Sequence, residues 1–398
     1  MKVKLPYRLS MLCLCAAVAL PALSDSGSSY KKNMFNPVRT SVTSLSIAPD
    51  ARAGAMGDVG AATEADANSQ YWNPAKYPFN IARAGVSVSY TPWLRKLVND
   101  INLANMAGFY RIGDYSAVSA SLRFFSLGEV FLSDMEDMTI NPYEFAVDAG
   151  YSRMLSERFS MAVNMRFIFS DIRYDYTAES KAGKAFAADI ALYRLGYFMM
   201  GNRECSFGWG LNINNIGSKI AYGGDDNAEF IPTNLRLGMN MTVPFNEYNK
   251  FSVAVDANKL LVPTFPKQDT ENGETESDYT DRVQKEYYDV SPIAGIFKSF
   301  HDAPNGFKEE MQEIQWSVGC EYTYNDRFML RGGYHHESAN KGNRKYFTVG
   351  AGFHMSVFTV DAAYVFSTSQ TNPLDQTMRF TLGFDLDGMK DLFGRRRR

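Results

Sequence analysis

The sequence predicts an all-β protein, a transmembrane antiparallel β-barrel of 14 strands with an N-terminal hatch inside the barrel. Three features predict this fold: an N-terminal export signal, apolar–polar alternation with a period of two, and connections that are alternately short and long. The composition agrees, because 398 residues that are 14% aromatic have a mean hydropathy of only −0.27, too low for a bundle of transmembrane helices. Lys and Arg number 41 against 44 Asp and Glu, which argues against a nucleic-acid-binding protein.

The N-terminus has the layout of a secretory signal peptide. A basic head precedes an apolar stretch over residues 9–20, and small residues lead to Ser24, after which we expect cleavage. An apolar stretch of about 12 residues is too short to cross a bilayer as a helix. The mature chain would keep Cys205 and Cys320, and their spacing leaves open whether they form a disulfide or stay free thiols.

Period-two alternation is clearest over residues 159–170. Every odd position there is apolar and most even positions are polar, including Asn164 and Arg166, so the two sets fall on opposite faces of a strand. A soluble sandwich also alternates, but segments of about 10 residues with one uniformly apolar face favour a membrane barrel. The predicted strands are 85–93, 101–111, 115–125, 143–153, 159–173, 184–199, 206–216, 233–244, 251–261, 315–324, 328–336, 346–355, 359–367 and 376–385.

The connections between these segments alternate in length. The short turns are 112–114, 154–157, 201–204, 245–250, 325–326 and 356–357. The longer loops are 94–100, 126–142, 174–183, 217–232, 262–314, 337–345 and 368–375. Short periplasmic turns and longer extracellular loops are typical of outer-membrane barrels, and an even strand number puts both termini in the periplasm. We therefore predict a barrel surrounded by outer-membrane lipid and lipopolysaccharide.

Residues 50–77, which precede the first predicted strand, have a different composition from the barrel. The three glycines in this stretch superficially resemble a phosphate-binding loop, but no Lys-Ser/Thr step follows them, so we expect close backbone packing in the barrel mouth instead. The motif residues of the stretch are Arg52, Gly54, Gly57, Gly60, Asn73, Pro74 and Ala75. The predicted divisions are a signal peptide (1–24), a hatch (25–84), the barrel (85–387) and a solvated basic periplasmic tail (388–398).

These motif residues carry a resemblance to a known family. Residues 52–60, 66–69 and 73–75 resemble the hatch of FadL-like barrels, and more closely that of the PorV family of type IX secretion system outer-membrane proteins in Bacteroidota. Residues 295–310 and 341–347 also resemble the PorV family, so that the resemblance covers essentially the whole mature chain.

The resemblance implies a non-enzymatic role in protein secretion, with no cofactor. It implies a shuttle that captures cargo proteins through their C-terminal signal domain at a Sov-like translocon and delivers them to an attachment complex containing a PorU-like sortase. The related attachment-complex anchor PorQ is an alternative, and residues 341–347 favour PorV. A FadL-like uptake channel for hydrophobic small molecules is the alternative from another class, with Tyr71, Trp72 and Phe79 lining its pocket.

Two of the longer loops are candidates for contact with cargo or partners. In the longest loop, the acidic residues 268–289 predict a solvated, mobile segment, whereas the apolar and charged residues that follow either pack on the barrel or dock a partner. The candidate binding residues are Gly295, Phe297, Phe300, Asp302, Phe307, Gly342, Asn343 and Arg344.

The end of one predicted strand carries residue types that an enzyme could use. His354 and Ser356 share a strand face, and Asp361 lies on the next strand, an arrangement that would suit a lipid deacylase. Residues two apart on one face are common by chance, and this pair lies beside a predicted periplasmic turn, so we predict no catalytic site. His335 and His336 lie on opposite strand faces, so we predict no metal site there.

Overall fold

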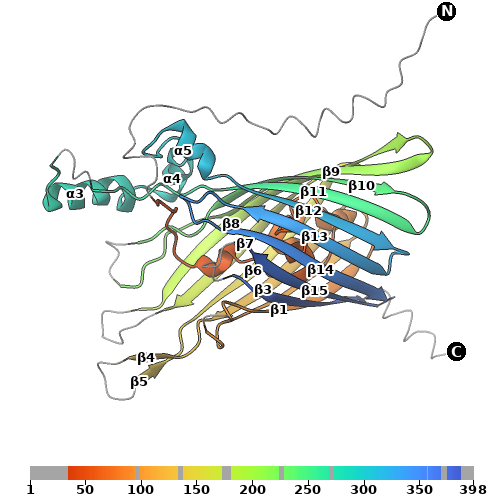
Figure 1. The fold of residues 1–398 in the computed structure, drawn as a ribbon, viewed down its shortest axis with the longest axis horizontal. Coiled ribbons are helices and arrows are strands. Elements are labelled where there is room, and N and C mark those ends of the chain that lie inside the picture. The colour runs from red at the N-terminus through yellow and green to blue at the C-terminus, as the bar shows by residue number, and fades with distance from the viewer. Residues whose placement is uncertain are drawn as a thin grey trace, which may run out of the picture. The chain divides into compact units, whose positions relative to one another are not determined.

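The structure, a computed structural model, describes residues 35–95, 98–132, 138–172, 181–223, 228–268, 273–355, 357–368 and 374–386. Within these residues, fourteen antiparallel strands form a closed barrel (Figure 1). The ring closes where β1 (Ala84–Pro92) pairs with β16 (Met378–Asp385). The predicted fold class is confirmed. The predicted signal peptide and basic tail lie outside the described residues.

The strand boundaries agree closely with the prediction. Each observed boundary lies within three residues of the predicted one. The other barrel strands are β2 (Asn102–Ile112), β3 (Ser116–Ser126), β6 (Tyr143–Ser156), β7 (Phe159–Asp171), β8 (Gly183–Met200), β9 (Arg203–Gly217), β10 (Asn234–Pro244), β11 (Asn249–Leu260), β12 (Gln315–Tyr324), β13 (Phe328–His336), β14 (Lys345–Met355) and β15 (Phe358–Ser367).

Strand β7 shows why alternation predicts the barrel so well. Asn164 and Arg166 are 0% and 6% exposed, whereas Val163 and Met165 are 48% and 70% exposed. The polar set therefore faces the interior, and the apolar set faces outward, where a bilayer solvates it. Arg166 is compensated inside the barrel by an ion pair with Asp189 of β8 at 3.0 Å. The predicted register of this strand is confirmed.

The connections are sorted by length between the two ends of the barrel, as predicted. We call these ends the short-turn end and the long-loop end. Several short turns use residues that tolerate a left-handed backbone, such as Gly113, Gly201 and Asn325, with φ angles of 65°, 67° and 52°.

The long-loop end carries extra structure. A small hairpin, β4 (Val130–Leu132) with β5 (Met138–Ile140), lies between β3 and β6. Residues 261–268 and 273–314 form a helical lid that contains α3 (Glu276–Val283), the π-helical turn η4 (Gln284–Tyr288), α4 (Pro292–Lys298) and α5 (Phe307–Gln312). Among the described residues, no helix is long and apolar enough to cross a membrane.

The prediction that residues 268–289 are solvated agrees with the described part of this stretch, where most side chains are exposed; the stretch is helical over α3 and η4, and its mobility stays a prediction. Thr275 caps α3, because its hydroxyl accepts a hydrogen bond from the backbone N–H of Asp278 at 3.2 Å. Tyr287 is fully buried and packs against Phe230 and Val262. The acidic composition of the segment gave no indication that Tyr287, near its end, is buried.

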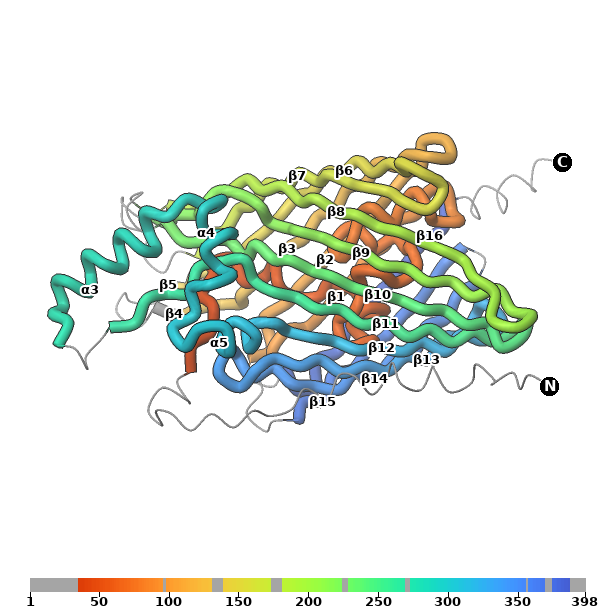
Figure 2. The backbone as a smooth tube through the Cα atoms, turned by 90° about the horizontal axis from the view of Figure 1, so that it is seen from above, coloured from red at the N-terminus to blue at the C-terminus, as the bar shows by residue number. Residues whose placement is uncertain are grey.

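We call residues 35–83 the hatch segment. It starts beside the lid, where Asn36 contacts Glu309, and its helical part lies within the ring of strands (Figure 2). The segment contains η1 (Thr43–Ser46), α1 (Ala51–Gly54), α2 (Ser69–Trp72) and η2 (Pro74–Phe79). Helix α1 contacts β14, β15 and β16, whereas η2 contacts β3, β6, β7 and β8. The segment thus bridges opposite halves of the barrel wall.

Candidate functional site

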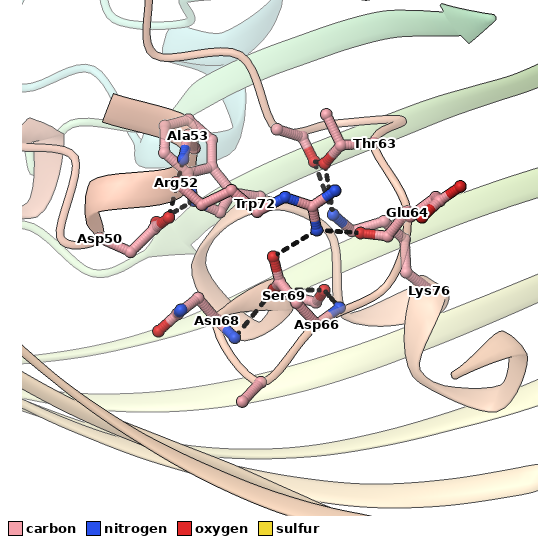
Figure 3. A network of polar contacts seen from close by, with 12 residues as sticks. Asp50, Arg52, Ala53, Thr63, Glu64, Asp66, Asn68, Ser69, Trp72 and Lys76 are labelled. Atoms are coloured by element: carbon pink, nitrogen blue, oxygen red, sulfur yellow. Dashed lines mark hydrogen bonds and ion pairs between the residues drawn. The ribbon is translucent and has the colours of Figure 1, made fainter. Parts of the chain in front are cut away.

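A polar network holds the hatch segment in shape (Figure 3). The carboxylate of Asp50 caps α1 by accepting from the Ala53 N–H at 2.9 Å, and it also accepts from the Trp72 indole N–H at 2.5 Å. Arg52 donates to the Asp66 carboxylate at 2.9 Å, and Lys76 donates to the carbonyl of Gly60 at 2.8 Å. Short helices that are marginal alone are therefore fixed by side chains from distant parts of the segment.

Charged groups of the barrel wall reach the hatch segment from several strands. Arg52 also pairs with Glu321 of β12 at 3.1 Å, and Glu321 in turn pairs with Arg331 of β13 at 2.6 Å. On the other side, the carboxylate of Asp58 pairs with the fully buried Arg379 of β16 at 2.5 Å. These pairs lie among buried groups, so removal of one partner would leave an uncompensated charge.

The predicted motif glycines lie where the backbone approaches its neighbours most closely. Gly57 has a φ of 74°, and a Cβ there would lie 2.7 Å from the backbone nitrogen of Tyr334. A Cβ on Gly60 would overlap the Trp72 ring, and one on Gly54 would overlap Arg379. The glycines therefore permit packing, as the sequence predicted, rather than cradling a phosphate.

The second half of the motif anchors η2. Asn73 caps this helix by accepting from the Ala75 N–H at 3.0 Å, and its amide donates to the carbonyl of Leu192 on β8 at 2.9 Å. Pro74 occupies the first helical turn, where its missing N–H costs nothing. Each of these residues has a structural role in joining the hatch segment to the wall.

The lid is fastened to the barrel rim by a cluster of buried charges, which we call the latch: Lys259, Glu309, Glu310, Glu313 and Lys341. Lys341 pairs with Glu309 at 2.6 Å and with Glu313 at 3.0 Å, and Lys259 pairs with Glu310 at 3.1 Å. Burial alone would raise the pKa of Glu309, but the Lys341 ammonium lowers it below its usual value. Sequence reasoning missed the latch, because its partners are distant in sequence.

The candidate binding residues of the lid divide into two groups. Phe297, Phe300 and Phe307 are 68%, 47% and 80% exposed. Gly295 instead packs against Phe230 and Pro263, and Asp302 accepts a hydrogen bond from the Thr264 N–H at 2.8 Å. Ile293 and Met311 are also exposed, and Met311 was not predicted. We call the exposed side chains the lid stripe: Ile293, Phe297, Phe300, Phe307 and Met311.

A cavity of about 440 Å³ lies beside the lid at the long-loop end. Trp93, Leu94 and Leu374 contribute apolar surface, and Lys341 contributes charge. The candidate residues Gly342, Asn343 and Arg344 also line the cavity. Arg344 is held by Glu337 at 2.8 Å, and Asn343 has a positive φ of 57°. The cavity is amphipathic rather than purely apolar.

The match to a protein family decides the identity of the chain. Residues 30–267, more than half of the chain, match the family described as type IX secretion system protein PorV. The chain belongs to the PorV family. It is therefore an outer-membrane component of type IX secretion. The stretches 295–310 and 341–347 lie beyond the matched residues, so their resemblance to PorV stays a prediction.

Solved structures similar to this PorV-family chain share little sequence with it. The toluene transporter TodX of Pseudomonas putida has 11% identity and a TM-score of 0.48, covering 88% of this chain and 99% of TodX. A deltaS2S3 mutant of TodX, described as a monoaromatic hydrocarbon channel, has 10% identity and a TM-score of 0.49, covering 84% and 98%. The Ralstonia pickettii toluene transporter TbuX has 12% identity and a TM-score of 0.43, covering 84% and 96%. No curated protein sequence matches the chain.

Of the aromatic residues expected to line an uptake pocket in this PorV-family chain, Tyr71 and Trp72 line a small cavity of about 70 Å³, and Phe79 does not. Tyr71 and Trp72 contact each other edge to face, and the guanidinium of Arg236 lies over the Trp72 ring at 4.5 Å. Phe79 packs elsewhere, against Tyr193. These side chains fill space in the hatch segment.

The three residues considered for a deacylase site do not form one in the described structure. Asp361 is ion-paired with Arg331 at 2.5 Å and lies opposite Gly352, whereas His354 lies opposite Thr359. Ser356 lies outside the described residues. Asp361 therefore pairs with the Arg331 guanidinium of the barrel wall and does not orient the His354 imidazole.

The structure also shows the state of the two cysteines and the surroundings of the adjacent histidines. Cys205 and Cys320 are free thiols, which answers the question that their spacing left open. His335 faces inward beside the Ser317 hydroxyl at 2.9 Å, and His336 stacks on Trp316. Within the part of the chain that the structure describes, no group of three or more His, Cys, Asp or Glu side chains could hold a metal ion.

Proposed function

We propose that this PorV-family protein is a shuttle in type IX secretion. It binds secreted cargo through the C-terminal signal domain at a Sov-like translocon, and it delivers the cargo to an attachment complex that contains a PorU-like sortase. The long-loop end faces the cell exterior and the short-turn end faces the periplasm, as is usual for outer-membrane barrels. The lid stripe carries the proposal.

The lid stripe has the properties of a docking surface. Its side chains are exposed by 46% to 80%, although they are large and apolar. Apolar side chains gathered on one short segment outside the barrel wall mark a contact site for another molecule. A shuttle must accept signal domains of many sequences, and broad apolar contact tolerates such variation better than one charged pocket does.

The latch supports this proposal because it fixes α5, the helix that carries Phe307 and Met311 of the stripe. Glu309 and Glu310 are buried neighbours on α5, and they pair with Lys341 and Lys259 at the barrel rim. Phe307 and Met311 on the same helix project outward. A preorganised surface loses less conformational entropy when a partner binds than a free loop does.

The hatch segment supports a carrier role over a protein-conducting one. Ala51, Ala55 and Val59 are 0% exposed, which places them in tight packing inside the ring. Open aqueous channels are found in barrels of about 16 to 18 strands, and this barrel has fourteen strands with its own chain inside. A folded cargo domain is therefore carried outside the lumen.

The test is a pull-down from detergent-solubilised outer membranes. The triple change Phe297→Ser, Phe300→Ser and Phe307→Ser should lower the recovery of signal-domain cargo at least ten-fold. The matched control changes three exposed aromatic residues at the short-turn end to serine and should keep recovery within two-fold; they are Phe245, Tyr248 and Phe328. Recovery of no cargo, no translocon and no sortase by the unmodified protein would end the shuttle proposal.

A second candidate function is uptake of a hydrophobic small molecule, which the cavity of about 440 Å³ favours. Trp93, Leu94 and Leu374 would contact such a molecule. The two functions differ in what copurifies with the protein. Mass spectrometry of the purified protein should find cargo domains under the shuttle proposal, and a stoichiometric lipid or hydrocarbon in this cavity under the uptake alternative.

A further inference from the structure

The outer face of the barrel has a hollow near its short-turn end that the secretion role does not use. The hollow measures about 700 Å³ and is lined by Ser156, Glu157, Arg158, Phe159, Arg194 and Trp209. Its residues come from the end of β6, the turn that follows it, and β7, β8 and β9. It therefore lies on the surface that meets the membrane, far from the lid.

Three of the lining side chains form one row across the sheet. Phe159 of β7 lies opposite Arg194 of β8, and Arg194 lies opposite Trp209 of β9. Directly paired residues share a face, and the neighbouring Ser160 is fully buried on the inward face. The row therefore points outward, with the Phe159 and Trp209 rings 6.2 Å apart.

The hollow carries an excess of positive charge. Arg158 and Arg194 are both exposed, and among the described residues neither forms an ion pair. Arg153 is exposed on the same outward face, one rung deeper, where it lies opposite Met161. Glu157 supplies the single carboxylate in the lining. An arginine on a lipid-facing surface is least costly at the membrane interface, where it can meet an anion.

The surroundings provide space for a headgroup and an apolar wall for acyl chains. On the side toward the turns, Gly196 lies opposite Phe207, and a Cβ added to Gly196 would meet only the Phe207 carbonyl oxygen, at 3.8 Å. On the other side, the next outward rung holds Met161, Leu192 and Leu211, with Arg153 at its β6 end. Charge and aromatic rings therefore lie together near the turns, and mainly apolar surface lies deeper, in the order of a lipid headgroup and its acyl chains.

We propose that this hollow binds one anionic glycerophospholipid. Arg158 and Arg194 hold its phosphate through forked N–H donors, Phe159 and Trp209 pack on its glycerol region, and its acyl chains lie along the apolar rung. The choice of a glycerophospholipid rests on the orientation proposed above, because the periplasmic leaflet of an outer membrane is made of glycerophospholipids. The role is that of an annular lipid site, separate from cargo binding.

Native mass spectrometry of the full-length protein in detergent tests this proposal, with dioleoylphosphatidylglycerol as the probe. One lipid should bind at least ten-fold more tightly than dioleoylglycerol, which lacks the phosphate. The double change Arg158→Gln and Arg194→Gln should weaken binding at least ten-fold. Lys184→Gln is the matched control, because Lys184 is an exposed cation on the same face of β8 at the other end, and it should change binding less than two-fold.

A second variant distinguishes a change in the binding site from a folding defect, because it should strengthen binding. Glu157→Gln removes the only lining carboxylate from an exposed turn, so it should tighten binding at least two-fold. Equal binding of phosphatidylglycerol by the double variant, equal binding of dioleoylglycerol, or tighter binding of lipid A would each overturn the proposal. Cargo pull-down depends on the lid, so this lipid assay and the shuttle test fail independently.

Discussion

The hatch segment and the lid are both held to the barrel by buried ion pairs, yet they expose very different surfaces. Around the Asp58–Arg379 pair, the hatch segment is enclosed on all sides, with Val59 0% exposed. Around the Glu309–Lys341 pair, the lid is covered on one side only, and Phe307 is 80% exposed on the other. Buried ion pairs thus hold both an enclosed segment and a lid that is exposed on one side.

The difference is why we propose the lid, and not the hatch segment, as the surface that contacts other molecules. Enclosure of the hatch segment makes it part of the folding unit of the barrel, so damage to it should be global. The lid adds little to the closed ring, and its damage should stay local. The predictions below separate these two kinds of effect, from the largest expected change to the smallest.

The largest effect is expected from Asp58→Ala. It leaves the buried Arg379 guanidinium without its carboxylate and the Tyr346 hydroxyl without an acceptor. We expect a loss of about 3–5 kcal/mol in the free energy of unfolding, measured by urea unfolding in detergent. The control is Asp326→Ala, which removes an exposed pair with Lys250 at a similarly positive φ, 53° against 63° at Asp58, and should cost about 1–2 kcal/mol. Equal losses would show that the hatch pair is not buried as described.

The next effect is expected from Gly57→Ala. The new Cβ would lie 2.7 Å from the Tyr334 backbone, and the positive φ adds strain, so we expect a cost of about 2–4 kcal/mol. Gly113→Ala carries the same backbone strain with nothing within 4 Å, and it should cost about 1 kcal/mol. If both variants lost the same stability in urea, close packing of the hatch segment against β13 would be excluded.

These first predictions concern contacts that the sequence made foreseeable only in part. Alternation in segments such as 159–170 is a local consequence of a wall between lipid and a polar interior, so strands and register could be predicted. The glycine-rich composition of residues 54–60 likewise indicated close packing. The wall residues that meet these glycines, such as Tyr334 and Arg379, could not be predicted, because they come from strands far along the chain.

The lid was predicted less well, for a physical reason. An acidic run normally stays solvated, and most of this one does, but distant residues bury Tyr287, which local composition could not predict. Of the candidate binding residues, the aromatic ones, such as Phe297, are exposed, as a contact surface requires, while Gly295 and Asp302 support the lid from within. Side-chain type indicated the chemistry but not the direction in which each side chain points.

A local effect is expected from Lys341→Met. Glu309 loses its ammonium partner, while Glu313 keeps Lys259. We expect the free energy of lid opening to fall by about 1–3 kcal/mol. The free energy of barrel unfolding in urea should not change. Limited proteolysis within residues 276–312 should become about ten-fold faster, whereas Lys308→Met, which changes an exposed neighbour, should leave the rate unchanged. A large drop in barrel stability would contradict the distinction between lid and hatch.

The smallest effect is the pH dependence of the lid. The pKa of Glu309 is lowered from its usual 4.5, so its stabilising effect is complete above about pH 4.5 and is lost as the pH falls through the lowered pKa. Burial raises the pKa of Asp302, and its protonation on acidification favours the closed lid, which offsets part of this loss. Hydrogen exchange in α5, corrected for intrinsic rates, should accelerate between pH 6 and pH 3.5.

Glu309→Gln supplies the control for this pH experiment. The variant cannot lose a charge at this position, so its exchange in α5 should vary less with pH than that of the unmodified protein. An identical pH response in both proteins would assign the effect to another group of the lid.

The bridging position of the hatch segment also constrains the order of assembly. Asp58 and Arg379 are separated by 321 residues, and the first strand must pair with the last to close the ring. Helix α1 contacts β14, β15 and β16, which emerge last during synthesis. A nascent chain therefore cannot seat its own N-terminal region until its C-terminal strands have arrived. Contacts of such long range make folding slow, and they make an intact C-terminal end a condition for a sealed barrel.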